Sequence, residues 1–317
     1  MNPDRRQLMG AALAAGLLPC LPAAAVRAER WAFGYFKNRD EGHPGLRLAV
    51  SADGLAFEPV QADEPVLLPT VGENRLLRDP CILKDPAGPW FHAVWTTAWE
   101  GVTVGYARSR DLLNWEAQVA LPVMADVPGT RNVWAPEIVF DTDRREFVIF
   151  WSSTVRGRFS DSAGTSEDDY NHRIFCTRTR DFQSFTPAQL LFDPGYSVID
   201  ATFHRSGGKL RMIFKDERLK PEHKWLQWCE ARTPLGPFGP VSRPFTRSWV
   251  EGPAAFQRGS ETIVLFDSYR DNRFEAAATR DFKTWRDASA QVRLPAGASH
   301  GSVFPIDESL YEALRRA

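Results

Sequence analysis

The sequence predicts an all-β chain folded as a five-bladed β-propeller with a short C-terminal helix. The main observation is a turn motif that returns five times and ends each time in an aromatic residue. Its copies occupy 51–57, 109–115, 179–185 and 279–285, with a degenerate copy at 233–238. The closing aromatic residues are separated by 58, 70, 53 and 47 residues, a spacing that suits one unit per propeller blade.

Short runs rich in β-branched and aromatic residues lie between the turn copies. Four of them are 91–97, 147–151, 210–214 and 262–266, and they are bounded by Gly, Asp or Pro. Helical periodicity appears only at the C-terminal end, in 307–316, where an Asp is suited to cap the first turn. Radial closure leaves few exposed strand edges, so the repeats and the short runs together indicate a propeller.

Composition excludes several classes of protein. The 317-residue chain has a formal net charge of −1, so we expect no basic surface for nucleic acid or for an anionic membrane. No run of about 18 apolar residues follows the first 30 positions, so we expect no membrane span. All-β domains reach this length as one unit, and we expect residues 29–317 to form a single domain.

The first 28 residues have the features of an export signal. Arg5 and Arg6 form a positive start, 8–18 is apolar, and 26–28 fits a small-x-small cleavage site. The paired arginines resemble a twin-arginine signal, with general secretion as the alternative. We therefore expect residues 1–28 to be removed and the mature chain to be periplasmic or secreted.

Three cysteines remain after that segment. Cys81, Cys176 and Cys229 all lie in apolar β-like runs, and their number is odd. They also lack the spacing of metal ligands. We therefore expect three buried thiols and neither a disulfide framework nor a zinc site.

A second series of residues repeats in step with the turns. One polar residue precedes each of five apolar runs, and these residues are Asp79, Glu137, Asp200, Glu251 and His300. The first strand of each blade lines the propeller axis, so we expect four carboxylates and one imidazole to converge there. Clustered acids repel one another and have divergent pKa values, which costs stability and suits acid–base chemistry.

The motifs around these residues resemble those of glycoside hydrolase family 43, whose fold is a five-bladed propeller. The resemblance runs from about Trp31 to the C-terminus through five motifs in blade order: 78–80, 134–137, 199–200, 250–253 and 299–302. The central segment 131–216, with 171–173 inside it and 214–217 at its end, resembles the α-L-arabinofuranosidase-like branch of the family.

The resemblance implies an inverting hydrolysis carried by three carboxyl groups. Asp79 is then the general base that activates water, and Glu251 is the general acid that protonates the leaving oxygen. Asp200 orients that acid and tunes its pKa. No cofactor is required. The implied substrate is an oligosaccharide or polysaccharide that carries pentose, α-L-arabinofuranosyl above all; β-xylosidase or galactosidase activity and a non-catalytic carbohydrate-binding propeller are the alternatives.

Further residues are candidates for substrate contacts. They are Glu137, Trp134, Trp95, Trp99, His300 and Arg273. Glu137 stands where many family members have Asp, so we interpret it as a channel or substrate contact. The three tryptophans suit either sugar stacking or packing between blades. His300 either faces an axial water network or ion, as in some relatives, or is structural. The polar stretch 161–169 is a candidate rim loop.

Two other propeller enzymes share parts of this pattern. Fructan-cleaving propellers have an Arg-Asp-Pro motif but also an Asn-Asp-Pro signature and a Glu-Cys pair, and here Gly252 follows Glu251. Sialidases have a similar turn motif but six blades. Five copies of the turn favour the family 43 interpretation.

Overall fold

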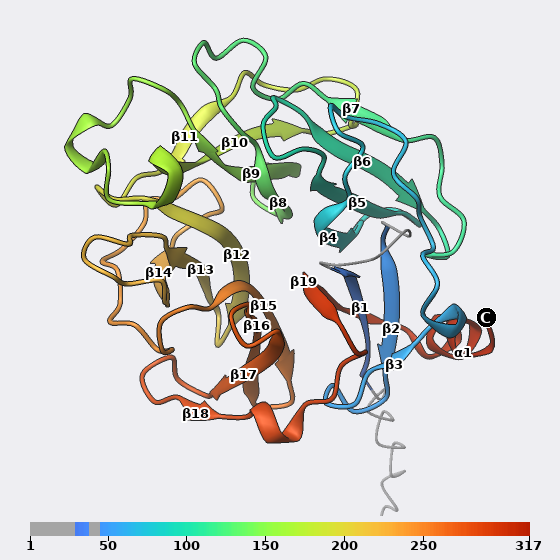
Figure 1. Cartoon of the computed structure of the whole chain (residues 1–317). Helices are drawn as coiled ribbons and strands as arrows, with labels where there is room; N and C mark the ends of the chain where they lie inside the picture. The colour runs from blue at the N-terminus through green and yellow to red at the C-terminus, as the bar shows by residue number, and fades with distance from the viewer. Residues whose placement is uncertain (1–28, 38–44) are drawn as a thin grey trace, which may run out of the picture.

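The computed structural model describes residues 29–37 and 45–317. The predicted export signal, residues 1–28, lies outside the described residues. The described chain forms five antiparallel sheets around a central axis and one α-helix (Figure 1). The prediction of a five-bladed propeller with a short C-terminal helix is confirmed. No helix among the described residues is long and apolar enough to cross a membrane.

The first sheet combines both ends of the described chain, in the order β19 (Ala298–Ile306), β1 (Arg30–Lys37), β2 (Arg47–Ser51) and β3 (Glu58–Pro59). The second sheet consists of β4 (Arg78–Lys84), β5 (Phe91–Thr96), β6 (Val104–Ser109) and β7 (Val119–Leu121). The third consists of β8 (Trp134–Asp141), β9 (Glu146–Thr154), β10 (His172–Thr179) and β11 (Gln189–Phe192).

The fourth sheet has three strands, β12 (Val198–Ser206), β13 (Lys209–Asp216) and β14 (Leu226–Ala231). The fifth consists of β15 (Glu251–Arg258), β16 (Glu261–Ser268), β17 (Arg273–Thr279) and β18 (Arg286–Asp287). Four 3₁₀ turns lie between strands of the described chain: η1 (Gln61–Asp63), η2 (Ser160–Ser162), η3 (Glu167–Asp169) and η4 (Ser289–Gln291).

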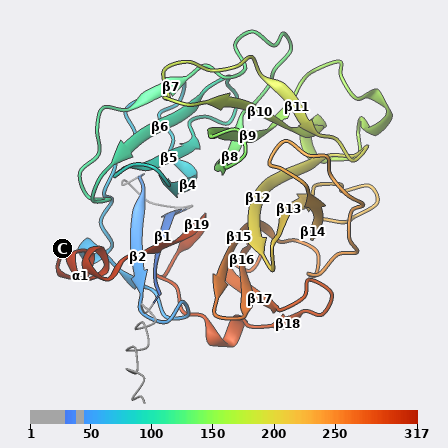
Figure 2. The ribbon, with the colours of Figure 1, turned by 180° about the vertical axis from the view of Figure 1, so that it is seen from behind.

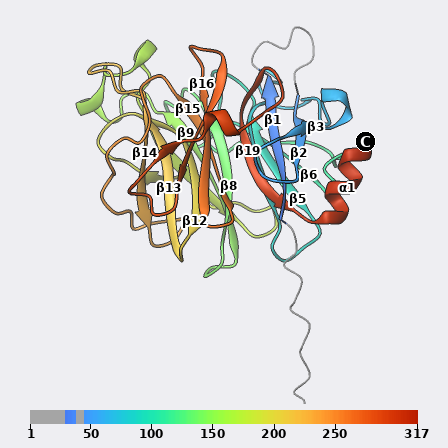
Figure 3. The same cartoon turned by 90° about the horizontal axis from the view of Figure 1, so that it is seen from below.

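The innermost strands β4, β8, β12, β15 and β19 lie nearest the axis, each beside the next (Figures 1 and 2). The ring closes where β19 pairs with β1, so the last strand of the chain completes the first sheet. Helix α1 (Glu308–Arg316) follows at the outside of the molecule, beside β1 and β2 (Figure 3). The Asp307 carboxylate caps this helix by accepting a hydrogen bond from the Leu310 N–H at 2.8 Å.

The repeated turn motif connects the third and fourth strands in four of the sheets, and its degenerate copy at 233–238 follows β14, the last strand of the three-stranded sheet. In the copy after β6, the Ser109 hydroxyl accepts a hydrogen bond from the Leu112 N–H at 2.9 Å. The Asp111 carboxylate accepts hydrogen bonds from the N–H groups of Leu113 and Asn114. These short polar side chains satisfy backbone donors that the turn leaves without strand partners, which explains why the motif recurs.

The core is divided into five buried hydrophobic clusters, one between each pair of neighbouring sheets. Leu48 of β2 and Ile82 of β4 belong to the cluster between the first and second sheets. Phe150 of β9 and Met212 of β13 belong to the cluster between the third and fourth. This packing holds the five innermost strands at fixed positions around the axis.

Candidate active site

Each innermost strand has a β-bulge at the same place. In β4, Arg78 pairs with Thr96 and Cys81 pairs with Val94. Two residues of β4 therefore lie between these pairs and only one residue of β5, so β4 has one extra residue. The same irregularity occurs in β8, β12, β15 and β19. A bulge bends the strand and redirects the side chain at the extra residue. It therefore places one residue of each strand in an unusual orientation at the axis.

The bulges correct the expectation that all five polar residues occupy equivalent positions on their strands. Asp79, Asp200 and His300 do share one position, directly after the last paired residue before the bulge. Glu251 lies one position earlier, and Glu137 lies two positions later. The five polar residues therefore occupy three different positions, because pairing register rather than distance along the chain decides equivalence.

Bulged backbone explains the residues that flank the acids. Asp79 and Asp200 have positive φ angles of 50° and 53°, and Gly252 has a φ of 60°. A Cβ atom on Gly252 would lie 2.5 Å from the Cγ of His300, so only glycine leaves room for the imidazole. Pro80 and Pro253 follow the bulge residues of their strands, at positions where a missing ladder donor is tolerated.

The N–H groups of the bulge residues connect neighbouring sheets. The Ala135 N–H donates to the Thr96 hydroxyl at 2.8 Å, and the Asp200 N–H donates to the Ser152 hydroxyl at 3.2 Å. The Gly252 N–H donates to the Asp200 carboxylate at 3.0 Å. These contacts tie four neighbouring sheets, the second to the fifth, to one another at the axis.

We use the name axial cluster for six residues at the axis. They are Asp79, Glu137, Asp200, Glu251, Asp267 and His300. The His300 Nδ1 atom lies 3.5 Å from an oxygen of Asp79 and 3.9 Å from an oxygen of Asp200. The two carboxyl groups therefore flank one imidazole. Burial alone would lower the pKa of His300, but Asp79 and Asp200 outweigh it and raise the pKa to about 9.

The pKa values of Asp79 and Asp200 shift in opposite directions, although both carboxyl groups are buried. Burial favours the neutral form of both. Hydrogen bonds from His300 and Thr96, together with the charge of Arg78, outweigh burial at Asp79 and lower its pKa. At Asp200, burial dominates and the charge of Glu251 adds to it, so the pKa rises to about 7. At neutral pH Asp79 is ionised, whereas Asp200 is partly protonated.

Glu251 is held by a buried lysine. Its Oε2 atom lies 2.8 Å from the Nζ of Lys215, whose side chain is 1% exposed. Lys215 also lies 2.8 Å from Glu217, and Glu217 is 2.5 Å from Lys224. Lys224 in turn lies 3.2 Å from Glu167 on η3. A chain of ion pairs thus runs from the axial cluster to the rim.

Burial also raises the pKa values of two further acids of the axial cluster. Burial raises the pKa of Glu137 to about 8, against an opposing hydrogen bond from Thr202. Burial and the charge of Glu251 raise the pKa of Asp267 to about 7. Asp267 lies on β16 opposite Glu251. Sequence reasoning missed Asp267 and the role of Lys215, because a charged residue near the end of an apolar run does not by itself indicate a site.

A model of the glycosyl hydrolase 43-related family, described as a "probable glycosyl hydrolase domain", matches residues 27–312 of the chain. The chain belongs to this family. An α-L-arabinofuranosidase of Bifidobacterium longum subsp. longum is 28% identical over 164 residues, which are 45% of this chain and 15% of that protein. The matched region therefore spans a small part of that relative.

Solved structures resemble this family 43-related chain in fold. A thermostable family-43 glycoside hydrolase matches with a TM-score of 0.54 and 17% identity, over 71% of this chain and 78% of that one. An exo-β-1,3-galactanase from Clostridium thermocellum matches with a TM-score of 0.50 and 14% identity, over 66% of this chain and 47% of that one.

The three tryptophans predicted to contact sugar differ in this family 43-related protein. Trp95 is 0% exposed and packs against Gly105, so of the two expectations for this ring, packing fits its position and stacking on a sugar does not. Trp99 is 53% exposed, and Trp134 is partly exposed. The Trp134 indole N–H donates to the Trp99 carbonyl at 2.9 Å, and the two rings meet edge to face. These two rings are available to a ligand.

Arg273 does not join the axial cluster. It begins β17, the third strand of its sheet, and its side chain is 64% exposed. Its guanidinium donates to Glu275 at 2.8 Å and lies 3.9 Å from Asp271. Both partners belong to the outer part of the fifth sheet, so the predicted substrate contact of Arg273 has no support in this arrangement.

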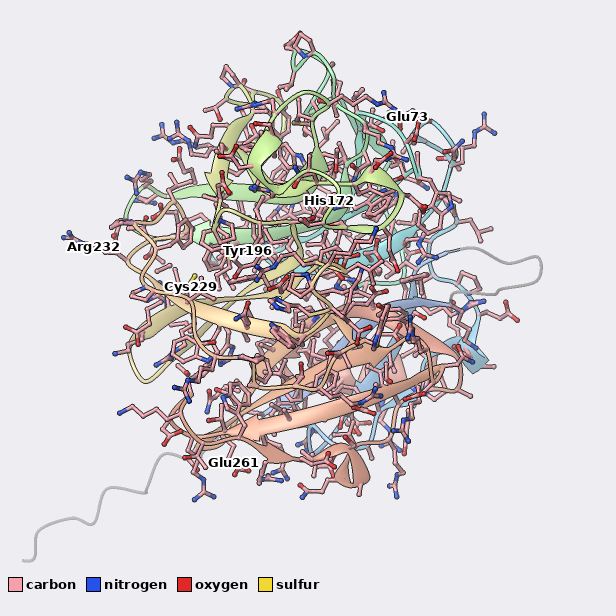
Figure 4. All side chains as sticks on the ribbon, turned by 60° about the vertical axis from the view of Figure 1, so that its left-hand side comes forward. Glu73, His172, Tyr196, Cys229, Arg232 and Glu261 are labelled. Atoms are coloured by element: carbon pink, nitrogen blue, oxygen red, sulfur yellow. The ribbon has the colours of Figure 1, made fainter. Side chains whose placement is uncertain are left out.

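The predicted rim loop 161–169 lies between β9 and β10 and is tied to neighbouring sheets. The Leu219 N–H donates to the Thr165 carbonyl at 2.7 Å, and Arg131 donates to the Asp168 carbonyl at 2.6 Å. His172, which opens β10, lies inside the molecule beneath this loop (Figure 4). Its ring stacks on Tyr170.

An ion at the axis beside His300 stays a prediction. Among the described residues, 29–37 and 45–317, no group of three or more His, Cys, Asp or Glu is arranged to hold a metal ion. The two carboxylates nearest the imidazole are its ion-pair partners. Cys81, Cys176 and Cys229 are buried free thiols in the described chain, as the sequence predicted.

Proposed function

We propose that this chain is an inverting glycoside hydrolase that removes α-L-arabinofuranosyl residues from oligosaccharides or polysaccharides. The observation that supports it best is the contrast between neighbouring carboxyl groups. Asp79 is ionised beside His300, whereas Asp200 retains a proton up to about neutral pH. Inversion needs an ionised base and a protonated acid. Asp79 therefore fits the base, and Asp200, whose charge interacts with that of Glu251, fits the neighbour that tunes the acid.

In the proposed reaction, Asp79 takes a proton from a water molecule. The water oxygen forms a bond to the anomeric carbon while the bond to the leaving oxygen breaks on the opposite face. Glu251 donates its proton to that leaving oxygen. Lys215 contacts only the Oε2 atom of Glu251, so we assign the Oε1 side to the leaving oxygen. Asp200 holds the Gly252 N–H next to Glu251 and so orients the acid.

The choice of sugar rests on the relatives. The Bifidobacterium relative is an α-L-arabinofuranosidase, and the segment 131–216 resembles that branch of family 43. The structural match to an exo-β-1,3-galactanase makes galactosyl the second candidate. The export signal proposed for residues 1–28 would bring the enzyme to polysaccharides outside the cytoplasm. A screen of aryl α-L-arabinofuranosides, β-xylosides and β-galactosides identifies the sugar, and early NMR spectra of the product give its anomeric configuration. Retention would contradict inversion.

The assignment of the acid has a sharper test. We expect Glu251→Gln to lose about 10²–10⁴-fold in rate on an aryl glycoside with a poor leaving group, because Gln cannot donate a proton as an acid does. On a very acidic phenol, whose oxygen departs without a proton, much of the rate should return. Asp79→Asn should show no such return, since its water lacks a base with either phenol. Equal losses of Glu251→Gln on both substrates would mean that Glu251 is not the acid.

A further inference from the structure

Arg78 occupies a sandwich between two aromatic rings beside the general base. Its guanidinium carbon lies 4.5 Å from the ring centre of Phe36 and 4.6 Å from that of Trp99. Phe36 is buried in β1, and Trp99 lies in the loop between β5 and β6. Contacts of this kind hold an arginine in place and remove water from its flat faces. Only the edge that carries the N–H donors remains available.

These donors have no acceptor among the described residues: no hydrogen bond or ion pair to the guanidinium of Arg78 occurs in 29–37 and 45–317. Arg131 is the informative comparison. It also stacks on a ring, 3.7 Å from the centre of Tyr170, but it donates to Glu100 at 2.9 Å and to the Asp168 carbonyl. Stacking on a ring therefore does not prevent an arginine from pairing in this protein.

Arg78 faces the axial cluster. It is the last paired residue of β4 before the bulge, directly before Asp79. The charge of Arg78 lowers the pKa of Asp79 and opposes the rise in the pKa of Asp267. Its guanidinium therefore acts electrostatically on both acids. Trp99 lies against Arg78, and Trp134 meets Trp99 edge to face and continues the aromatic surface. A ligand bound across these rings would pass the edge of Arg78.

The loop that carries Trp99 is built to keep the sandwich in place. The Glu73 carboxylate accepts hydrogen bonds from the Val102 N–H at 2.7 Å and from the Thr97 hydroxyl at 3.0 Å. Glu73 itself lies toward the edge of the molecule, away from His172 in the interior (Figure 4). The loop is thus braced from outside at both ends. Arg78 is consequently presented in a fixed geometry before any ligand arrives, which reduces the entropic cost of binding.

We propose that Arg78 binds the carboxylate of a uronic acid residue in the glycan, next to the sugar that is removed. A guanidinium edge has two parallel N–H donors and no acceptor, which matches a carboxylate better than a hydroxyl, since a hydroxyl also needs an acceptor. The inference deepens the proposed function and rests on it: the substrate is then an acidic glycan rather than a neutral one.

The test uses one polysaccharide in two forms. An arabinogalactan that carries glucuronic acid is compared with the same material after carbodiimide activation and borohydride reduction, which turn each carboxylate into a primary alcohol. We expect the wild-type enzyme to hydrolyse the acidic form with a kcat/KM about tenfold higher or more, the value of a charge-assisted hydrogen bond. Arg78→Gln should reduce this ratio to about one, and Arg78→Lys should keep part of it. Because the ratio compares two forms, any effect of Arg78 on Asp79 cancels.

Arg131→Gln is the matched control, because it removes an equal charge from the same aromatic surface and should keep the preference. Equal wild-type rates on both forms would overturn the inference. An equal loss of Arg78→Gln on both forms would also overturn it and assign Arg78 to hydroxyl contacts. If the wild type hydrolyses no glycan and no aryl glycoside, the proposed function fails, and calorimetric binding of the two forms decides on Arg78 alone. Tighter binding of the acidic form that Arg78→Gln abolishes supports the carboxylate site, and equal binding contradicts it.

Discussion

Buried carboxyl groups at the axis differ in protonation because each has different neighbours. Asp79 is paired with His300, and that pairing outweighs the loss of hydration. Glu137 has no cation at ion-pair distance among the described residues, so burial raises its pKa to about 8. An acid pair with separated pKa values is what general acid–base chemistry needs. The separation arises from single contacts, which makes it testable one residue at a time.

Glu137→Gln tests this balance through stability. The pKa of the folded-state carboxyl is about 8 and the ordinary value is 4.5, so the folded protein retains a proton that the unfolded chain loses. The contribution of Glu137 to stability is therefore fully present below about pH 4.5 and is lost as pH rises to about 8. Gln resembles the protonated acid and does not titrate. We expect the two proteins to be similar at pH 5, and the variant to be more stable by on the order of a few kcal/mol at pH 8.

Urea unfolding at pH 5, 6.5 and 8 measures the difference. Glu116→Gln is the control, because it removes only an exposed ion pair with Arg108 and should change stability by less than about 1 kcal/mol. A stability difference between Glu137→Gln and wild type that stays constant from pH 5 to pH 8 would contradict the raised pKa.

At the scale of the strand, the bulges of the innermost strands place the catalytic candidates. A regular strand alternates its side chains between two faces, and an extra residue is needed to redirect one of them to the axis. The positive φ angles of Asp79 and Asp200 are the local cost of that orientation. Gly252 occupies the equivalent position in β15, where a side chain would clash with the imidazole of His300.

Gly252→Ala separates the local strain from the placement of His300. Gly259 has a similar φ of 56° in the turn before β16, but no atom lies within 4 Å of a Cβ there. We expect Gly259→Ala to lose about 1 kcal/mol of stability with little change in kcat/KM. Gly252→Ala should add displacement of the imidazole from Asp79, which we expect to lower kcat/KM about 100-fold. The same kcat/KM in both variants would show that the position of His300 is unimportant.

For the molecule as a whole, closure of the ring brings distant parts of the sequence together. β19 and β1 pair although most of the chain lies between them, and His300 reaches Asp79 only through that pairing. α1 follows outside the ring, where Tyr311 and Leu314 extend the cluster between the first and second sheets. Closure and the helix therefore contribute differently: the first builds the site, and the second adds stability.

Two truncations distinguish these contributions. Removing residues 308–317 deletes α1 and two buried side chains, so we expect a loss of a few kcal/mol and a lower Tm, with kcat/KM unchanged well below that Tm. Removing residues 298–317 also deletes β19 and leaves β1 without its inner partner. That chain should show no cooperative melting by circular dichroism. A cooperative transition for the shorter chain would mean that closure by β19 is not required for folding.

The sequence by itself determined the elements and their number, because turns and strands are encoded locally. A Ser or Thr with an Asp two positions later satisfies the donors of the turn in four copies, and together with the degenerate copy at 233–238 they imply five blades. The acids before the apolar runs were likewise visible, since the innermost strand of each blade begins there. These patterns depend on residues that are close in the sequence, and they can be recognised without knowing the pairing register of the strands.

Only the tertiary structure decided which side chains meet. The bulges spread the polar series over three positions, Trp95 is enclosed by its own sheet, and Arg273 turns to Glu275. Lys215 of the fourth sheet pairs with Glu251 of the fifth. Arg78 lies between the rings of Phe36 in the first sheet and Trp99 in a loop of the second. Such contacts depend on pairing register and on packing between sheets, so a single strand read alone does not contain them.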